Sequence, residues 1–318
     1  MADNLLEDFF KGDTRALSRI ITRVENRSPD SLVLLQQLFP HTGNSRVIGV
    51  TGSPGSGKST LVDRLATAYR QEHKTIAIVA VDPSSPFTGG AILGDRIRMQ
   101  THGIDPGIYI RSMATRGHLG GLATATTDVV SVLDAAGKNP IIVETVGVGQ
   151  DEVDIVKLAD ISIVVLVPGM GDDVQALKAG IMEIGDIFVI NKCDRPGVDK
   201  MERAVLAVLS LAHRPDGWQP PVLRTVATEG RGIDELVESI ERCHTFFQNS
   251  ASRAEKKREA AKQRLITLLE ERLLTTAIER VFPDSELNKV VGQIADRFQD
   301  PYSIVDEIVR NSQFQRLK

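Results

Sequence analysis

The sequence predicts an α/β fold: a mostly parallel sheet, with helices before and after it. Three observations predict this fold. Seven short apolar runs follow one another between residues 47 and 226, a glycine-rich loop follows the first run, and segments with helical periodicity lie on both sides of the set. Continuous rather than alternating apolar runs are typical of strands buried on both faces, as in parallel sheets covered by helices.

The N-terminal segment, residues 1–44, is expected to be helical. Its apolar residues recur at three-to-four spacing, and Asp13 precedes the second helical pattern as an N-cap would. Residues 45–245 are then predicted to form the domain that contains the sheet. Its expected strands are Val47–Val50, Thr75–Val81, Ile108–Ile110, Ile141–Val143, Ile161–Val167, Ile187–Ile190 and Val222–Val226.

The C-terminal segment, residues 246–318, is expected to be helical again. A long charged helix spans Ser250–Phe282, and shorter ones are predicted over Ser285–Phe298 and Tyr302–Asn311. The long helix carries a narrow apolar stripe, which either covers the edge of the sheet or packs against a second copy of the chain. We adopt the second reading, a dimerisation region that makes the protein a homodimer.

Composition excludes several functional classes. The chain has 318 residues, 42% hydrophobic and 25% charged, with a formal net charge of −4. It lacks the basic excess typical of nucleic-acid-binding proteins, and its apolar runs are far shorter than the roughly 20 residues that span a bilayer. The acidic start does not resemble a secretory signal, and Cys193 and Cys243 form no metal-binding or disulfide pattern. We therefore expect a cytoplasmic protein without nucleic-acid or membrane partners.

The strongest motif is a phosphate-binding loop between the first strand and a helix. Gly52-Ser-Pro-Gly-Ser-Gly-Lys58-Ser59 matches G-x-x-x-x-G-K-[ST] in full. In this motif glycine amides and the helix N-terminus surround the phosphates, the lysine contacts the β- and γ-phosphates, and the serine hydroxyl ligates Mg²⁺. The residues predicted to bind the triphosphate are Gly52, Pro54, Gly55, Ser56, Gly57, Lys58, Ser59 and Thr60.

A second motif, at the end of the sixth strand, predicts that the base is guanine. Asn191-Lys192-Cys193-Asp194 fits N-K-x-D, in which the aspartate can accept hydrogen bonds from N1–H and the 2-amino group of guanine. Lys192 is expected to cover the base and Asn191 to hold the loop. After the seventh strand, the loop at Ala227 and Thr228 is the place where a GTPase presents a backbone N–H to the guanine carbonyl.

Carboxylates at strand ends are the candidate magnesium and catalytic residues. Asp82 ends the second strand, Asp95 lies at a predicted helix start, and Glu144 ends the fourth strand. With Lys58 and Ser59 they are expected to organise Mg²⁺ and hydrolysis, while the Gly147 amide contacts the γ-phosphate. The alternative readings are a turn aspartate, an N-cap and a charge at the edge of the sheet.

A further loop follows the fifth strand. Asp172, Gln175 and Lys178 recur every three residues there, so they share one helix face. We interpret them as a mobile element that couples nucleotide state to a partner; the alternative is an ordinary helix start with a solvated lysine.

Taken together, these motifs resemble the MeaB/ArgK family, the GTPase chaperones of adenosylcobalamin-dependent acyl-CoA mutases such as methylmalonyl-CoA mutase. The matching stretches are GVTGSPGSGKST, VAVDPSSPFTGGAILGDRIRM, TRGHLGGL, ETVGVGQDEVDI, PGMGDDVQALKAG and NKCD.

The resemblance implies a SIMIBI-type domain that binds GTP and Mg²⁺, the latter at Ser59, Asp82, Asp95 and Glu144. It implies switches I, II and III at 82–99, 144–154 and 168–180, with Asp172, Gln175 and Lys178 responding to the mutase. It also implies that the mutase accelerates a slow GTPase, and that nucleotide state gates cofactor loading and protects the mutase. The cobalamin would belong to the mutase.

Other functions remain open at this point. A nickel metallochaperone GTPase would carry Cys/His ligands, yet the six histidines are scattered, and only His118 lies in a tight loop. A P-loop kinase would use ATP, which N-K-x-D disfavours. A transport or signalling GTPase without a mutase partner would share every nucleotide motif.

Overall fold

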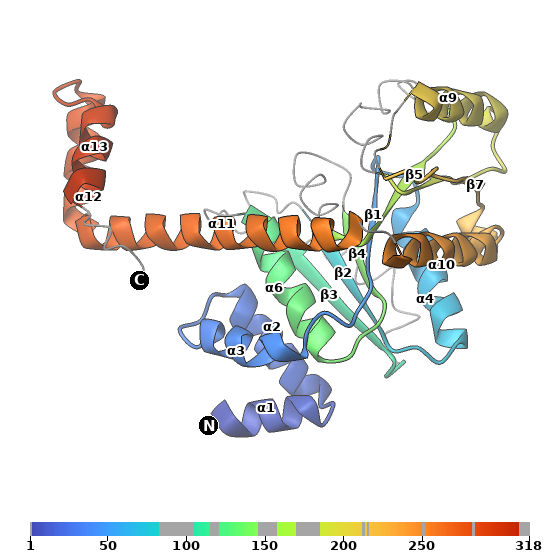
Figure 1. Cartoon of the computed structure of the whole chain (residues 1–318), viewed down its shortest axis with the longest axis horizontal. Coiled ribbons are helices and arrows are strands. Elements are labelled where there is room, and N and C mark those ends of the chain that lie inside the picture. Colours follow the sequence, from blue (N-terminus) through green and yellow to red (C-terminus); the bar gives the residue numbers. More distant parts are fainter. Residues whose placement is uncertain are drawn as a thin grey trace. The chain divides into compact units, whose positions relative to one another are not determined.

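The computed structural model describes residues 2–82, 105–114, 121–145, 158–169, 185–211, 214, 216–249, 252–281 and 284–311. By its internal contacts the chain divides into two compact units, residues 1–255 and 256–318. The sheet lies in the first unit, and the second consists of helices (Figure 1).

All seven predicted apolar runs form strands of one parallel sheet, in the order β3-β2-β4-β1-β5-β6-β7. The predicted α/β fold is therefore confirmed. The strands are β1 (Val47–Gly52), β2 (Ile76–Asp82), β3 (Ile108–Ala114), β4 (Ile141–Thr145), β5 (Ile161–Leu166), β6 (Ile187–Ile190) and β7 (Val222–Arg224). Because every strand runs the same way, the carboxyl ends of β1, β2, β4 and β6, with the residues that follow them, lie on the same side of the sheet.

Helices cover both faces of the sheet, which explains why the strands are continuously apolar. On one face α4 (Lys58–Gln71) and α10 (Ile233–Asn249) pack over Ile48, Val50 and Ile163. On the other, α2 (Thr14–Glu25) and α6 (Gly121–Ala135) cover the half of the sheet that contains β2 and β3 (Figure 1). Helix α9 (Val198–Leu211) packs on β5 and β6.

The N-terminal segment is helical, as predicted. Helices α1 (Ala2–Phe10), α2 and α3 (Ser31–Leu38) precede the 3-10 turn η1 (Phe39–His41). The predicted N-cap of α2 is present, because the Asp13 carboxylate accepts a hydrogen bond from Ala16 N at 2.7 Å. The apolar stripe of α2, including Ile20 and Ile21, is fully buried in the core shared with α6.

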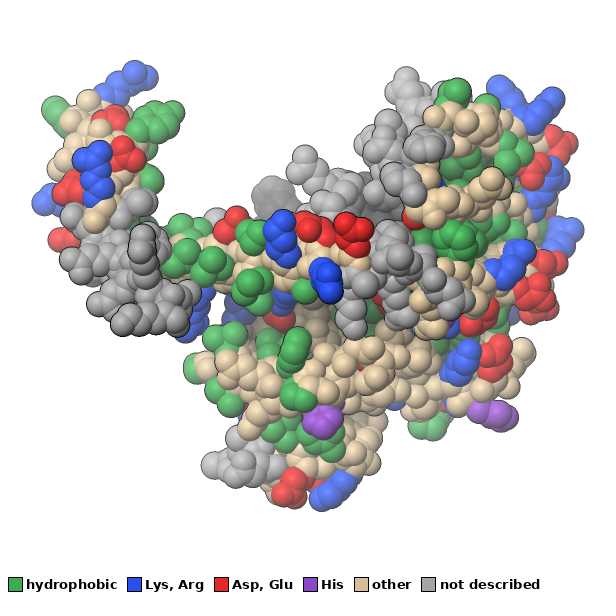
Figure 2. All heavy atoms as spheres, in the orientation of Figure 1, with side chains coloured by type: hydrophobic (Ala, Val, Ile, Leu, Met, Phe, Trp, Pro, Cys, Tyr) green, Lys and Arg blue, Asp and Glu red, His purple; other side chains and the backbone are tan. Residues whose placement is uncertain are grey.

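The C-terminal segment forms α11 (Ser252–Val281), α12 (Asp284–Ala295) and α13 (Pro301–Asn311), close to the predicted ranges. The boundary between the two compact units falls within α11. Hydrophobic side chains are exposed along α11 in Figure 2. They include Leu265, Ile266, Leu268, Leu269, Leu273 and Leu274. Among the described residues no helix is both long and apolar enough to cross a bilayer.

Candidate nucleotide-binding site

The loop between β1 and α4 has a backbone that only glycine supports at two positions. Gly52 has φ 144°, and a Cβ there would lie 2.1 Å from the carbonyl oxygen of Val165 on β5. Gly57 has φ 91°, and its Cβ would lie 2.4 Å from Nδ2 of Asn191. Any larger residue would therefore push the loop away from the neighbouring strand and from the loop that follows β6. Gly57 also directly precedes α4, so the helix N-terminus faces this loop.

Lys58 lies inside this loop with little exposure to solvent. Its Nζ donates hydrogen bonds to the carbonyl oxygens of Gly52 at 2.7 Å and Ser53 at 3.1 Å, and the residue is 6% exposed. A carbonyl is a neutral acceptor, whereas a phosphate oxygen is charged and forms the stronger bond with an ammonium group. The ammonium is therefore held where a polyphosphate can recruit it.

Ser59 and Glu144 meet at the carboxyl ends of β1 and β4. The Ser59 hydroxyl donates a hydrogen bond to Oε1 of Glu144 at 2.5 Å, and Glu144 pairs in register with Val50 of β1. Glu144 is 7% exposed, so its carboxylate is directed toward the loop rather than toward bulk solvent. A hydroxyl and a carboxylate are oxygen donors of the kind that Mg²⁺ prefers, and this pair fits that ion. The backbone of Asp82 ends β2, the strand next to β4.

Asn191 joins three segments that lie far apart in the sequence. Its Nδ2 donates to the carbonyl oxygen of Ser56 at 2.9 Å, and its Oδ1 accepts from Thr225 Oγ1 and Ala227 N, each at 3.1 Å. The side chain is buried, with 2% exposure. The phosphate-binding loop, the N-K-x-D segment and the loop after β7 are thus linked by one amide group.

Lys192 makes a second link between the same loops. Its Nζ donates to the carbonyl oxygen of Gly55 at 2.7 Å, which extends the lysine stem along the phosphate-binding loop. Asp194, two residues later, is exposed. Its carboxylate is therefore accessible to a base that lies over the Lys192 stem.

Arg64 is a contact that the sequence reasoning missed. It lies on α4, and its guanidinium donates to the carbonyl oxygens of Ala227 at 3.0 Å and Thr228 at 2.8 Å, in the 3-10 turn η3 (Ala227–Glu229). Nothing in the sequence distinguishes this arginine from others on an amphipathic helix. The only signal is its place on the helix that the phosphate-binding loop begins.

The predicted site residues thus divide into two groups. The structure brings together the phosphate-binding loop, Ser59, Glu144, the N-K-x-D segment and the loop of Ala227 and Thr228. Asp95, Gly147, Asp172, Gln175, Lys178 and His118 lie outside the described residues, and of Asp82 only the backbone is described.

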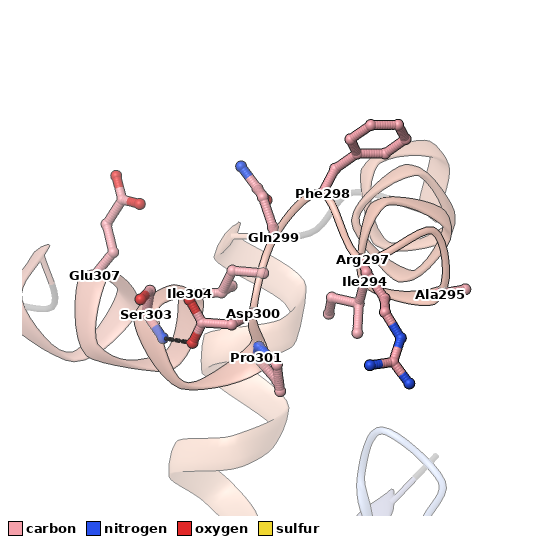
Figure 3. Close-up of a pocket in the computed structure, with 10 residues that line it drawn as sticks. All are labelled: Ile294, Ala295, Arg297, Phe298, Gln299, Asp300, Pro301, Ser303, Ile304 and Glu307. Carbon is pink, nitrogen blue, oxygen red and sulfur yellow. Dashed lines mark hydrogen bonds between the residues drawn. The ribbon is translucent and has the colours of Figure 1, made fainter.

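A separate hollow lies in the second unit, at the turn between α12 and α13 (Figure 3). The Asp300 carboxylate accepts a hydrogen bond from Ser303 N at 2.8 Å, and bonds to Ser303 hold the pKa of Asp300 below its ordinary value. This pattern is that of an N-cap for α13. The hollow contains none of the predicted nucleotide-binding residues. In the part of the chain that the structure describes, no group of three or more His, Cys, Asp or Glu side chains could hold a metal ion.

Comparison with known proteins identifies the family. Residues 17–281 match the family model described as methylmalonyl-CoA mutase-associated GTPase MeaB. This chain belongs to the MeaB family. It is therefore a GTPase by class, and the resemblance noted from its motifs is confirmed.

Three relatives show how far the similarity extends. A relative from Pyrococcus abyssi is 48% identical over 313 residues, covering 98% of this chain and 96% of that protein. The GTPase ArgK of Escherichia coli is 34% identical over 291 residues, covering 89% and 87%. The mouse protein named methylmalonic aciduria type A homolog, mitochondrial, is 31% identical over 290 residues, covering 86% and 70%.

A solved structure supports the same fold. The crystal structure described as a LAO/AO transport system kinase superposes with a TM-score of 0.71 at 27% identity, covering 98% of this chain and 97% of that one. The similarity to this MeaB-family chain therefore includes the helical segments at both ends as well as the sheet.

Proposed function

We propose that this MeaB-family protein binds and hydrolyses GTP with Mg²⁺, and that its nucleotide state controls an adenosylcobalamin-dependent acyl-CoA mutase of the methylmalonyl-CoA mutase type. The observation that carries the nucleotide assignment is the direct link between the phosphate-binding and N-K-x-D loops through Asn191 and Lys192. One bound molecule with a triphosphate and a guanine base would contact both loops. The mutase assignment is supported by the name of the family model and by the mouse relative.

The chain's own groups would divide the work as follows. The amides of the phosphate-binding loop and Lys58 bind the phosphates, Ser59, Asp82, Asp95 and Glu144 hold Mg²⁺, and the Gly147 amide contacts the γ-phosphate. When bound, Mg²⁺ would neutralise charge on the β- and γ-phosphate oxygens. Asp194 reads the guanine edge while Lys192 covers its face, and the Ala227–Thr228 loop presents a backbone N–H to the guanine carbonyl.

Control by the partner would pass through three switches, at 82–99, 144–154 and 168–180. Asp172, Gln175 and Lys178 of the third switch are the proposed contacts that respond to the mutase. The nucleotide state would gate adenosylcobalamin loading and protect the mutase, and the cobalamin would remain a cofactor of that partner.

The protein would act in the cytoplasm as a homodimer, without nucleic-acid or membrane partners. We assign residues 1–44 to an N-terminal helical segment, 45–245 to the GTP-binding domain and 246–318 to the dimerisation region. The dimer is supported by the exposed leucines of α11, of which Leu265 is 66% and Leu269 53% exposed. Apolar side chains in such a row favour burial against a second surface.

The test is GTP hydrolysis by the purified protein with Mg²⁺, alone and with an adenosylcobalamin-dependent acyl-CoA mutase. ATP is run in parallel, and light scattering gives the mass of the same sample. We expect slow turnover of GTP only, a marked increase with the mutase, and the mass of a dimer. GTP turnover that ignores the mutase would contradict the partner assignment and favour a signalling or metallochaperone GTPase. Turnover of ATP with a phosphorylated acceptor would favour a kinase.

A further inference from the structure

The loop that follows β7 is held from two sides by side chains of different segments. From one side Asn191 Oδ1 accepts hydrogen bonds from Thr225 Oγ1 and Ala227 N. From the other, Arg64 on α4 donates to the carbonyl oxygens of Ala227 and Thr228. The two peptide units that follow Ala227 and Thr228 are therefore fixed by donors from another element.

Fixing a carbonyl also fixes the amide of the next residue. A trans peptide unit is planar, and its C=O and N–H point in opposite directions. Because the Ala227 carbonyl is directed at Nε of Arg64, the Thr228 N–H is directed away from Arg64. The Thr228 carbonyl accepts from a second guanidinium nitrogen, and the amide of the next unit, Glu229 N, donates to the carbonyl oxygen of Val226 at 2.9 Å within the turn.

Only a planar fork can hold both carbonyls at once. Nε and one terminal nitrogen of arginine donate in parallel from a rigid group, whereas a lysine ammonium is a single point on a flexible stem. The two bonds, at 3.0 and 2.8 Å, use this fork on adjacent carbonyls of one turn. The neighbouring backbone adds support, because Gly230 N also donates to the Ala227 carbonyl, at 3.2 Å.

We propose that Arg64 is a positioning residue for base selection. By holding the Ala227 carbonyl it orients the Thr228 N–H toward the 6-oxo group of a purine, without touching the nucleotide itself. The proposal rests on the guanine assignment made under the proposed function. It adds that a side chain of α4 fixes the direction of the backbone N–H that donates to the guanine carbonyl. It also ties base selection to α4, the helix that begins at Lys58 and Ser59.

The test compares nucleotides that differ at position 6 of the purine, using the full-length protein and calorimetry or competition binding. GTP and ITP carry the 6-oxo group, whereas 2-aminopurine riboside triphosphate does not. In Arg64→Met, which keeps the length of the aliphatic stem, we expect the affinities for GTP and ITP to fall together by about tenfold, the worth of one hydrogen bond. The affinity for 2-aminopurine riboside triphosphate should stay within about twofold of wild type, since it cannot use that bond.

Two further variants separate positioning from general destabilisation. Arg64→Lys keeps the charge but cannot hold both carbonyls, and we expect an intermediate loss confined to GTP and ITP. Arg203→Met is the matched control: Arg203 is an exposed arginine on α9 whose Nε also donates to a backbone carbonyl, that of Asp199 at 3.1 Å. It should leave all three affinities unchanged.

Three results would overturn the proposal, and they differ from one another. An equal loss for all three nucleotides would mean that Arg64 only stabilises the fold. If Arg64→Met binds all three nucleotides as wild type does and still prefers those with the 6-oxo group, Arg64 has no role in base selection. The guanine assignment would then remain in place. A wild-type protein with no preference for the 6-oxo group would overturn the guanine assignment, and Arg64's role with it.

Discussion

Two sets of side-chain hydrogen bonds to the backbone, one where the strands begin and one where they end, run in opposite directions. At the amino ends of the strands, carboxylates accept hydrogen bonds from backbone amides: Asp134 from Ser45 N at 2.9 Å, Asp160 from Val47 N at 2.8 Å and Asp186 from Ser162 N at 2.9 Å. At the carboxyl ends of the strands, Lys58 and Lys192 instead donate hydrogen bonds to backbone carbonyls of the phosphate-binding loop.

The difference separates permanent from exchangeable bonds. A bond between a carboxylate and an amide is charge-assisted, and nothing in a nucleotide replaces it at the beginning of the strands. A bond between an ammonium and a neutral carbonyl is weaker than one to a phosphate oxygen, so a bound phosphate can replace the carbonyl partners of Lys58. We infer that the hydrogen bonds at the amino ends of the strands stabilise the fold, whereas the carboxyl ends are prepared for a ligand.

The largest effect is expected from removing Lys58, the buried cation at the carboxyl ends of the strands. Lys58→Ala should lower kcat for GTP by about 10²–10³-fold, because it removes a positive donor from the developing charge on the phosphates. Calorimetry should show weakened GTP binding, while thermal melting without nucleotide reports whether the variant folds. Lys11→Ala, at a side chain that is 70% exposed, is the control. Normal GTP affinity in Lys58→Ala would contradict the assignment of this loop.

A second change tests whether Asp194, in the loop that follows β6, recognises the base. Asp194→Asn should weaken GTP binding by roughly 10²-fold and shift the preference toward xanthine nucleotides, because the carboxylate is replaced by a group that suits the 2-oxo edge of xanthine. Asp194 is exposed, so we expect little change in the free energy of unfolding. The measurement is the ratio of GTP to XTP affinity, with Asp199→Asn, an exposed carboxylate on α9, as the control. An unchanged ratio would mean that Asp194 does not read the base.

The fold and the motif residues can be predicted from the sequence for a clear physical reason. Strands buried on both faces need continuous apolar runs, and a phosphate-binding loop needs glycines at fixed offsets, so both leave local patterns. Glu144 is predictable as a site residue because a parallel sheet brings strand ends together, and the structure adds the hydrogen bond that it accepts from Ser59.

The links between segments could not be predicted in the same way. The bonds from Arg64 to η3 and from Lys192 to Gly55 join residues far apart in the sequence, through side chains that many surface positions carry. Which arginine reaches which carbonyl depends on the packing of α4 and α10 against the sheet, and that packing has no local pattern. The same holds for Arg46, whose partner Glu241 lies on α10.

The smallest effect is expected at the amino ends of the strands, and it should be on stability alone. Glu241→Gln removes the charge that pairs with Arg46. The Arg46 side chain is 14% exposed, and two of its nitrogens donate to the Glu241 carboxylate, one of them at 3.0 Å. The free energy of unfolding should fall by about 1–2 kcal/mol at pH 7, a moderate value because Glu241 itself is 42% exposed and screened by solvent. GTP turnover and the ratio of GTP to XTP affinity should stay at wild-type values.

The pH dependence of this difference gives the sharper test. The hydrogen bond from Arg46 holds the pKa of Glu241 below its ordinary value, against the opposing effect of burial. Its stabilisation is therefore complete above the pKa of the unfolded chain, about 4.3, and is lost as the pH falls through the lower pKa of the folded protein. Denaturant unfolding should show wild type and Glu241→Gln separated at pH 7 and converging in acid. Glu7→Gln, at a side chain that is 66% exposed, should show no such separation. A gap that persists unchanged into acid would mean that packing, not charge, holds α10 to the beginning of β1.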